Sequence, residues 1–586
     1  MSAPGGTLVA EAAALTPARK RWTLLAVILG SGIVFLDTSV VNLALPRIGE
    51  ELSSELFGTL EAQSYVANGY FVTLSALLIL AGALSDYFGR RRIFAIGLVG
   101  FAATSLLCGI APSMEFLIVC RILQGAAGAV LVPGSLAIIT ATFQGEEQGR
   151  AFGLWAGASA ATTILGPFVG GLLVNTISWR MAFLINLPFL LLAYLATVGF
   201  VPESRDEQAT GRFDWLGSLV VAVAVAGLAF GTIRGQQHGW SEPIAMVSLV
   251  VGAVAAIALP LLMTRRRDPL VPSRLFRSRN FTVTNISTFV IYGALYVTLT
   301  FLGIFMIGTL GYNEQAAGIA LVPTSLFLVL FSSRIGKLAA RFGPRLFMSL
   351  GPAIMALGLL WLARIPADSQ GWMLGGDRSA SIVPPADYFT DLLPGLVVFG
   401  IGLSIMVAPL TTALMTSVPA RNSGVASAIN NAISRVGSPL VNALIFVAVA
   451  ASFYATIGQQ VPGVDTGSRA FRNVVAPLNQ PSADVSPEVR AAAQQASTEA
   501  FHLAMLVAAG LLIAGAAING FGIRNPAPAS RQLGPGAEQP PPESGSGAPS
   551  GPVPVGAEEF GKQHPQADRP GPANRGVQPA HGPGRR

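Results

Sequence analysis

The sequence predicts an all-helical integral membrane protein, and three observations support this. The chain has 586 residues, of which 52% are hydrophobic and only 11% are charged, whereas soluble domains carry roughly 25% charged residues. The charged residues lie in short clusters between long apolar runs. Many of these runs reach the about 20 residues that a helix needs to cross a bilayer. The composition therefore argues against a water-soluble enzyme.

Fourteen apolar runs of this length follow one another along the chain. The predicted spans are 23–45, 64–84, 93–111, 114–136, 150–174, 181–202, 215–234, 243–263, 282–306, 316–334, 346–364, 389–414, 425–451 and 500–522. The polar residues 1–22 precede the first span, and no small-residue cleavage site follows a short apolar core. We therefore expect the first span to be an uncleaved anchor.

Basic residues favour one side of the predicted membrane protein. Clusters follow the second span (Arg90–Arg92), the eighth span (265–279) and the tenth span (337–345), whereas the opposite segment 46–63 is poor in positive charge. The positive-inside rule places the basic turns in the cytoplasm. This predicts a multi-pass protein of the cell membrane with both termini in the cytoplasm.

An internal repeat predicts two similar halves. Residues 82–91 (GALSDYFGRR) and 336–345 (GKLAARFGPR) share two glycines, a leucine, a phenylalanine and an arginine at the same offsets. Repeated halves are typical of alternating-access transporters, whose substrate site lies between them at the bilayer midplane. The predicted parts are a cytoplasmic tail (1–22), a six-helix bundle (23–202), two inserted helices (203–264), a second six-helix bundle (265–522) with an outer loop (452–499), and a disordered Pro/Gly-rich cytoplasmic tail (523–586).

Several other classes of protein do not fit the sequence. A net charge of +7 could suggest a nucleic-acid partner, but the arginines separate apolar runs instead of covering one face, so none is expected. Two cysteines and four scattered histidines predict no metal site and no disulfide framework. The chain lacks a GxxxxGK[ST] phosphate loop, which argues against ATP-driven transport, and no cofactor is expected.

Five motifs resemble those of the major facilitator superfamily and follow its order. They are the loop signature after the second span (82–92, GALSDYFGRRR), the first-span motif of the fourteen-span drug:proton antiporters of the EmrB/QacA type (36–46, LDTSVVNLALP), the basic fourth-span motif (121–125, RILQG), the antiporter motif (166–171, GPFVGG) and the junction of spans five and six (179–188, WRMAFLINLP). The resemblance covers residues 23 to about 522. Thr162 and Tyr65 depart from it, because the family usually has glycine and tryptophan there. It implies a major facilitator fold: two six-helix bundles plus two inserted helices.

Asp37 is the first candidate functional residue. It lies about 14 residues, or roughly 21 Å, into the first span. An unpaired carboxylate there costs several kcal/mol, so a functional role is the default interpretation. Because desolvation favours the neutral form of a carboxyl group, Asp37 is a candidate proton carrier. The alternative is a structural residue that hydrogen-bonds neighbours such as Ser39 and Asn42.

Arg121, in the fourth span, falls at a similar depth to Asp37. The resemblance implies that spans one and four are neighbours, so the two charges could form a proton-coupling pair. A fixed structural ion pair is the alternative. Gln124 lies one turn on, on the same face as Arg121, and we assign Asp37, Asn42 and Gln124 to the substrate cavity.

Gly82, Asp86, Gly89 and Arg90 form a candidate conformational gate at the membrane edge. The glycines permit a tight turn, and Asp86 can bind a helix N-terminus or an arginine. The resemblance implies that this motif stabilises the outward-facing state; a turn that only sets topology is the alternative. The second copy of the motif has Ala340 where the first has Asp86, so the gate is predicted to be asymmetric.

Span five carries the candidate antiporter motif. Gly153, Gly166 and Gly170 allow a close approach to neighbouring helices, and Pro167 bends the helix. Gly171 completes the motif. The resemblance implies that this tight interface limits leak, although generic helix packing explains the glycines equally well.

The combined prediction is a secondary active transporter, not an enzyme. We expect a proton-coupled multidrug efflux antiporter that exports lipophilic or cationic, drug-like toxic compounds and contributes to antibiotic resistance. The first alternative is a narrow-specificity exporter of a metabolite such as an antibiotic, siderophore or lipid. The second is a membrane sensor or scaffold that signals through residues 524–586. The sequence shows no docking signal for an adaptor protein.

Overall fold

The computed structural model describes residues 15–525 except 53, 55–58, 206–212, 267–268, 375–382 and 483–484. The chain divides into two units, 1–526 and 527–586. Only the first unit contains described residues. The predicted tail therefore lies, from residue 526 onward, outside the described part of the chain.

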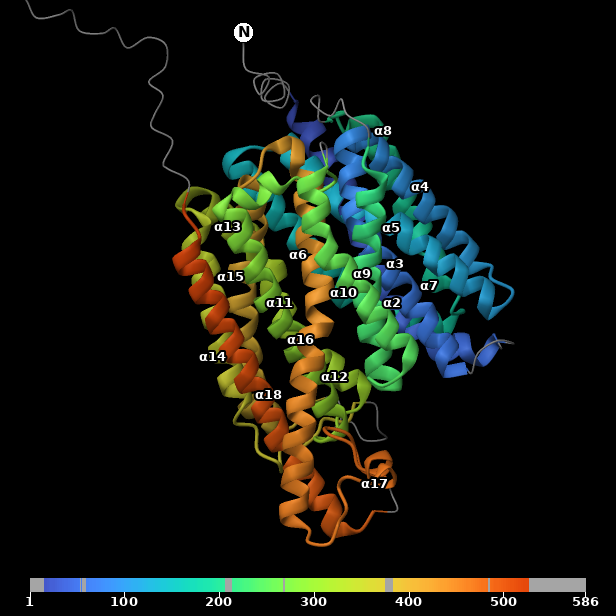
Figure 1. Cartoon of the computed structure of the whole chain (residues 1–586), viewed down its shortest axis with the longest axis vertical. Helices are drawn as coiled ribbons and strands as arrows, with labels where there is room; N and C mark the ends of the chain where they lie inside the picture. The colour runs from blue at the N-terminus through green and yellow to red at the C-terminus, as the bar shows by residue number, and fades with distance from the viewer. Residues whose placement is uncertain are drawn as a thin grey trace, which may run out of the picture. The chain divides into compact units, whose positions relative to one another are not determined.

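The described residues of the first unit fold into helices joined by short connections (Figure 1). Those before the connection at 206–212 are α2 (Pro17–Glu51), α3 (Thr59–Phe88), α4 (Arg90–Gly109), α5 (Met114–Thr142), α6 (Gly145–Thr176), α7 (Met181–Leu184) and α8 (Asn186–Phe200). The later ones are α9 (Trp215–His238), α10 (Pro243–Arg265), η1 (Ser273–Arg277), α11 (Arg279–Gly308), α12 (Glu314–Ala320), α13 (Val322–Phe342), α14 (Pro344–Leu362), η3 (Tyr388–Leu392), α15 (Leu393–Thr416), η4 (Ala420–Asn422), α16 (Ser423–Gln460), α17 (Arg469–Val474) and α18 (Pro487–Gly522).

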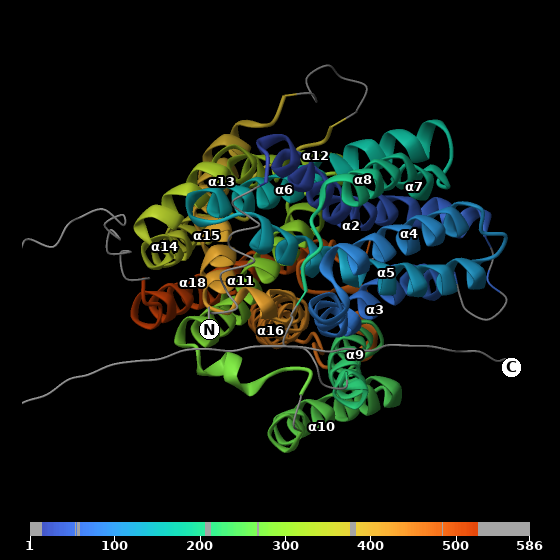
Figure 2. The ribbon, with the colours of Figure 1, turned by 90° about the horizontal axis from the view of Figure 1, so that it is seen from above.

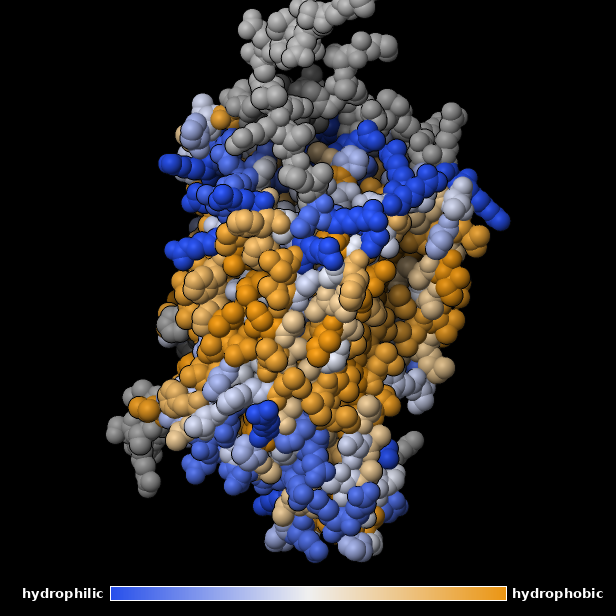
Figure 3. Space-filling view, turned by 90° about the vertical axis from the view of Figure 1, so that its left-hand side faces the viewer, coloured by the Kyte–Doolittle hydropathy of each residue, from blue (hydrophilic) through white to orange (hydrophobic). Residues whose placement is uncertain are grey.

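Thirteen helices within the described ranges are long and apolar enough to cross a membrane. The 32-residue α6 is a further long helix, and it packs against both α2 and α13. An apolar band lies between two hydrophilic ends on the face shown in Figure 3. This confirms the prediction of an all-helical membrane protein.

Two helices extend well beyond the predicted spans. Helix α16 continues to Gln460 and α18 begins at Pro487, so most of the segment 452–499 is helical and carries the short α17 between them. The predicted spans are shorter because a prediction from apolar runs ends a span where polar residues begin. The alanine-rich segment 487–499 is polar yet favours a helix, because alanine, glutamine and glutamate are good helix formers.

The long helices form two halves with an inserted pair beside them (Figure 2). We call α2–α8 the first half and α11–α18 the second half. Each half supplies most of one apolar core, which includes Phe94 and Phe101 in the first and Phe305 and Phe399 in the second. The inserted helices α9 and α10 pack on each other, and α9 also contacts α3 and α16.

Polar side chains attach α9 to both halves. Arg234 donates a hydrogen bond to the Tyr65 hydroxyl of α3 (2.6 Å), and Ser64 of α3 bonds Gln237 (3.0 Å). On the other side, Gln236 donates to the Pro439 carbonyl of α16 (3.2 Å). Helix α9 therefore bridges the place where α3 meets α16.

The two halves meet closely at paired glycines. Gly82 of α3 lies against Gly424 of α16, and Gly336 of α13 lies against Gly149 of α6. A Cβ atom on any of the four would overlap the partner's backbone, so small residues are required for this approach. We call these contacts the α3–α16 seam and the α6–α13 seam. Both glycine pairs lie near the α3–α4 and α13–α14 turns, which form what we call the basic end.

Gly82→Ala should separate the halves at the basic end, because the new methyl group would overlap the Gly424 carbonyl. The measurement is the distance between spin labels at the exposed positions 92 and 341, which lie on different halves. We expect a longer distance in Gly82→Ala than in the native chain. Gly303→Ala is the matched control, because nothing lies within 4 Å of the added atom. Equal distances in all three proteins would contradict a close glycine contact.

Candidate functional site

A buried ion pair joins two helices of the first half. Arg121 Nη1 of α5 lies 2.6 Å from Asp37 Oδ2 of α2. Asp37 is fully buried and Arg121 is 1% exposed. The fold thus brings together the two charges that the sequence placed at a similar depth.

Neutral donors complete the coordination of Asp37. Its Oδ1 accepts hydrogen bonds from Gln124 Nε2 (3.1 Å) and from Asn186 Nδ2 (3.0 Å). Both amides also donate to Ser105 Oγ, at 2.8 and 3.1 Å. The carboxylate therefore has three side-chain donors, drawn from α5 and the start of α8.

Arg121 has several other partners besides Asp37. Its guanidinium donates to Gln124 Oε1 (2.7 Å) and to the Val66 carbonyl (3.2 Å). The guanidinium carbon lies 4.0 Å from the centre of the Tyr70 ring and 5.7 Å from that of Phe183. These cation–π contacts from α3 and α7 add to the ion pair.

Of the three residues assigned to the substrate cavity, the fold brings Asp37 and Gln124 into this network. Asn42 is exposed further along α2 and is not among the hydrogen-bond partners of Asp37. Sequence reasoning did not single out Asn186 and Ser105. Asn186 lies in the junction motif 179–188, and this motif could have pointed to it. Ser105 lies in none of the motifs, and only its hydrogen bonds in the folded chain identify it.

The predicted gate residues lie at the α3–α16 seam. Asp86 Oδ1 accepts from Arg90 Nη2 (2.8 Å) and from the Gly424 amide (3.2 Å), and Oδ2 accepts from the Val425 amide (3.0 Å). Both side chains of the Asp86–Arg90 pair are nearly inaccessible. A carboxylate at the N-terminus of α16 is favoured by the unpaired amides and the helix dipole.

Arg90 extends this contact across the seam. Its Nη2 donates to the carbonyl of Ala420, just before α16. Gly89 has φ +107°, a conformation that side chains disfavour, and it lets the chain turn sharply from α3 into α4. Gly82, Asp86 and Arg90 thus form one contact that joins the two halves, and Gly89 forms the turn beside it.

The α6–α13 seam has weaker polar contacts. Ala340 packs against Gly149, and the ion pair nearest to this contact joins Lys337 to Glu146 over 3.5 Å. Both of these side chains are about half exposed, at 59% and 48%. Exposed pairs contribute little stability, so the polar part of the gate is concentrated at the α3–α16 seam.

The predicted antiporter motif lies on two faces of α6. Gly153 packs on the backbone of Ser332 in α13, whose hydroxyl donates to the Gly153 carbonyl (2.7 Å). Gly166 packs against Ser39 of α2 and Gly170 against Val40. Pro167 and Gly171 also lie in α6, but their side-chain surroundings fall outside the description. Helix α6 therefore connects the helix that carries Asp37 to the second half.

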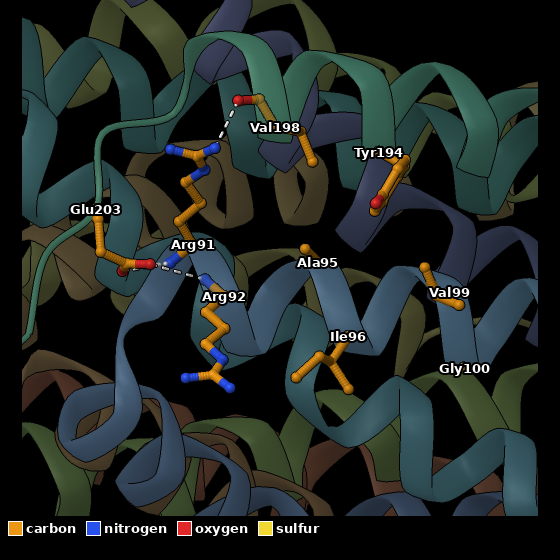
Figure 4. Close-up of a pocket in the computed structure, with 9 residues that line it drawn as sticks. All are labelled: Arg91, Arg92, Ala95, Ile96, Val99, Gly100, Tyr194, Val198 and Glu203. Carbon is orange, nitrogen blue, oxygen red and sulfur yellow. Dashed lines mark hydrogen bonds between the residues drawn. The ribbon is translucent and has the colours of Figure 1, made fainter. Parts of the chain in front are cut away.

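An open groove of about 670 Å³ lies at the basic end of α4 and α8 (Figure 4). It is lined by Arg91, Arg92, Ala95, Ile96, Val99, Gly100, Tyr194, Val198 and Glu203. Glu203 accepts hydrogen bonds from the backbone amides of Arg91 (3.1 Å) and Arg92 (3.2 Å). All nine residues belong to the first half, so this groove is distinct from a midplane site between the halves.

Two helical halves, an apolar band between hydrophilic ends and a buried ion pair between two apolar helices are features of a two-bundle membrane transporter. The family model described as Major Facilitator Superfamily matches residues 27–441. Among solved structures, the human organic anion transporter MFSD10 (TETRAN) aligns with a TM-score of 0.53, 15% identity and coverage of 86% of this chain and 100% of that chain. The proton:xylose symporter XylE aligns with a TM-score of 0.51, 15% identity and coverage of 84% and 94%. At this identity both structures support the fold alone.

Several curated proteins are similar over most of their length. The multidrug resistance protein Stp of Mycobacterium tuberculosis is 33% identical over 440 residues, covering 74% of this chain and 77% of Stp. The puromycin resistance protein pur8 of Streptomyces alboniger is 32% identical, with coverage of 75% and 83%. The tetracenomycin C resistance and export protein of Streptomyces glaucescens is 30% identical, with coverage of 73% and 76%. The chain belongs to the major facilitator superfamily.

Asp86→Asn should destabilise the protein on the order of 3 kcal/mol, because it leaves the buried Arg90 without a charged partner. Glu146→Gln is the matched control at the other seam, where an exposed pair is lost at a cost of about 0–1 kcal/mol. The measurement is the thermal unfolding midpoint of the purified full chain in detergent. Equal midpoints for the two variants would show that the Asp86 contact adds no more stability than an exposed ion pair does.

Proposed function

We propose that this chain is a proton-driven exporter of lipophilic toxic compounds, of the fourteen-span drug:proton antiporter type. The observation that supports this proposal most is the buried Asp37–Arg121 ion pair, which joins two apolar helices long enough to cross a membrane. The similarity to proteins named for drug resistance supports the substrate class. In this proposal the basic end faces the cytoplasm, as the positive-inside rule favours.

The proposed cycle uses Asp37 as the proton carrier. The charged carboxylate pairs with Arg121 and accepts bonds from Gln124 and Asn186. Protonation from outside neutralises Asp37 and frees Arg121 from its charge partner, which disfavours the present packing of α2 on α5 and triggers substrate release and return. Loss of the proton to the cytoplasm restores the pair and permits loading.

The gate contact sets which side is closed. With the halves joined at the basic end through Asp86, Arg90 and the N-terminus of α16, the cytoplasmic side is closed and the state is outward-facing. The return step must break these bonds. The energy comes, in this proposal, from the proton gradient acting on Asp37, because binding differences are what shift a two-state equilibrium.

A narrow-specificity exporter is the second candidate. Relatives named for single antibiotics, puromycin and tetracenomycin C, favour it. A panel of compounds separates the two candidates: a multidrug exporter transports several unrelated members, whereas a dedicated exporter transports one. A sensor or scaffold would bind without flux. Adaptor partners form no part of this proposal.

The experiment uses the full chain in proteoliposomes with an imposed pH gradient and a panel of puromycin, tetracenomycin C and ethidium. We expect Asp37→Asn to abolish gradient-driven transport but to retain exchange of substrate down its own gradient, because only the proton carrier is lost. Glu50→Gln is the matched control: Glu50 pairs with Arg47 on the same helix, but the pair is exposed. Gradient-driven transport by Asp37→Asn at the native rate would refute Asp37 as the proton carrier.

A further inference from the structure

Besides Arg121, Arg435 is an arginine that lies deep in the membrane unit. It follows Ser423, the first residue of α16, by about twelve residues, which places it roughly 18 Å along the helix. Because the hydrocarbon core is about 30 Å thick, this position is near the bilayer midplane. Its side chain is partly exposed instead of enclosed in the core.

Arg435 differs in its partners from the two buried arginines of the first half. Arg90 pairs with Asp86, and Arg121 pairs with Asp37. For Arg435, no carboxylate within the described ranges lies within 4.0 Å and no described acceptor takes a hydrogen bond from it. Its contact is with an aromatic ring: the guanidinium carbon lies 5.4 Å from the centre of Phe71 in α3.

The Phe71 contact places Arg435 between the two halves. On α16, Gly424 and Ala428 meet Gly82 at the basic end, and Arg435 lies on the same face two turns further on, opposite Phe71. Asn442 follows after two more turns, and its buried side-chain oxygen has no hydrogen-bond partner among the described residues. Beyond the α3–α16 seam, α16 therefore carries two polar side chains, Arg435 and Asn442, with hydrogen-bonding atoms that have no partner among the described residues.

Helix α3 separates this cation from the Asp37 network. Tyr70 faces the first half and stacks on Arg121, whereas the next residue, Phe71, faces Arg435. Asp37 pairs with Arg121, whereas Arg435 has no carboxylate partner among the residues that the structure describes.

An arginine stays protonated in proteins, and a charge at membrane depth needs either a partner or a polar pathway. We propose that Arg435 binds the anionic group of an amphipathic substrate between the two halves, with Asn442 as a second polar contact. The substrate class is therefore lipophilic organic anions, such as carboxylates and phenolates, in preference to cations. This inference rests on the proposed transport function and names its substrate class.

The test measures equilibrium binding to the full chain in lipid nanodiscs without a pH gradient. The probes are fluorescein, an aromatic anion, and ethidium, an aromatic cation, and binding is followed by fluorescence anisotropy. We expect Arg435→Gln to weaken fluorescein binding about tenfold or more, which is the usual effect of losing a hydrogen bond to a charged group. Arg435→Lys keeps the charge and should recover part of the affinity, and ethidium binding should not weaken in either variant.

Arg364→Gln is the matched control, because Arg364 also lies over an aromatic ring, Trp361 at 5.9 Å, but is exposed. It should bind fluorescein as the native chain does. Equal fluorescein affinity in the native chain and in Arg435→Gln would overturn the inference, as would a native chain that binds ethidium but not fluorescein. A failure of proton coupling would instead appear as gradient-independent flux with this binding difference intact.

Discussion

The buried pair of Asp37 and Arg121 is the interaction on which the arrangement of the first half depends. A bilayer offers no water to unpaired charges, so each of these residues can stay ionised only while the other is in place. That requirement holds α2 against α5, where Gln124 adds a second bond, and the Asn186 amide attaches α8 to the same carboxylate. A polar network of this kind joins three helices through the side chain of one acidic residue.

The two seams share a backbone design but differ in chemistry. Paired glycines bring the halves together at both, whereas only the α3–α16 seam carries a buried carboxylate that binds a helix N-terminus. Repeated sequence motifs explain the shared part, because the same glycine offsets recur. The single replacement of the acid by Ala340 explains the difference. One seam therefore has a directional, charge-dependent contact, and the other has mainly close packing.

The spans and the candidate pair could be predicted from the sequence for a physical reason: a bilayer dictates both the length of an apolar run and the cost of a charge inside it. Asn186 and Ser105 could not be identified in this way, because neutral polar residues inside a span cost little and have many structural uses. Arg435 was missed because the surrounding run stays apolar on average. Its contact with Phe71, over 350 residues away in sequence, exists only in the folded chain.

The attachment of α9 to the two halves is unequal, and this has a consequence for motion. Among the described residues, Arg234 and Ser64 form hydrogen bonds between α9 and α3, and Gln236 forms one between α9 and α16. In the proposed transport cycle, separation of the halves at this seam requires the bond of Gln236 to break if α9 stays with α3. The inserted pair α9–α10 then moves together with the first half. The bilayer would therefore surround two bodies of unequal width, the first half with the inserted pair and the second half alone.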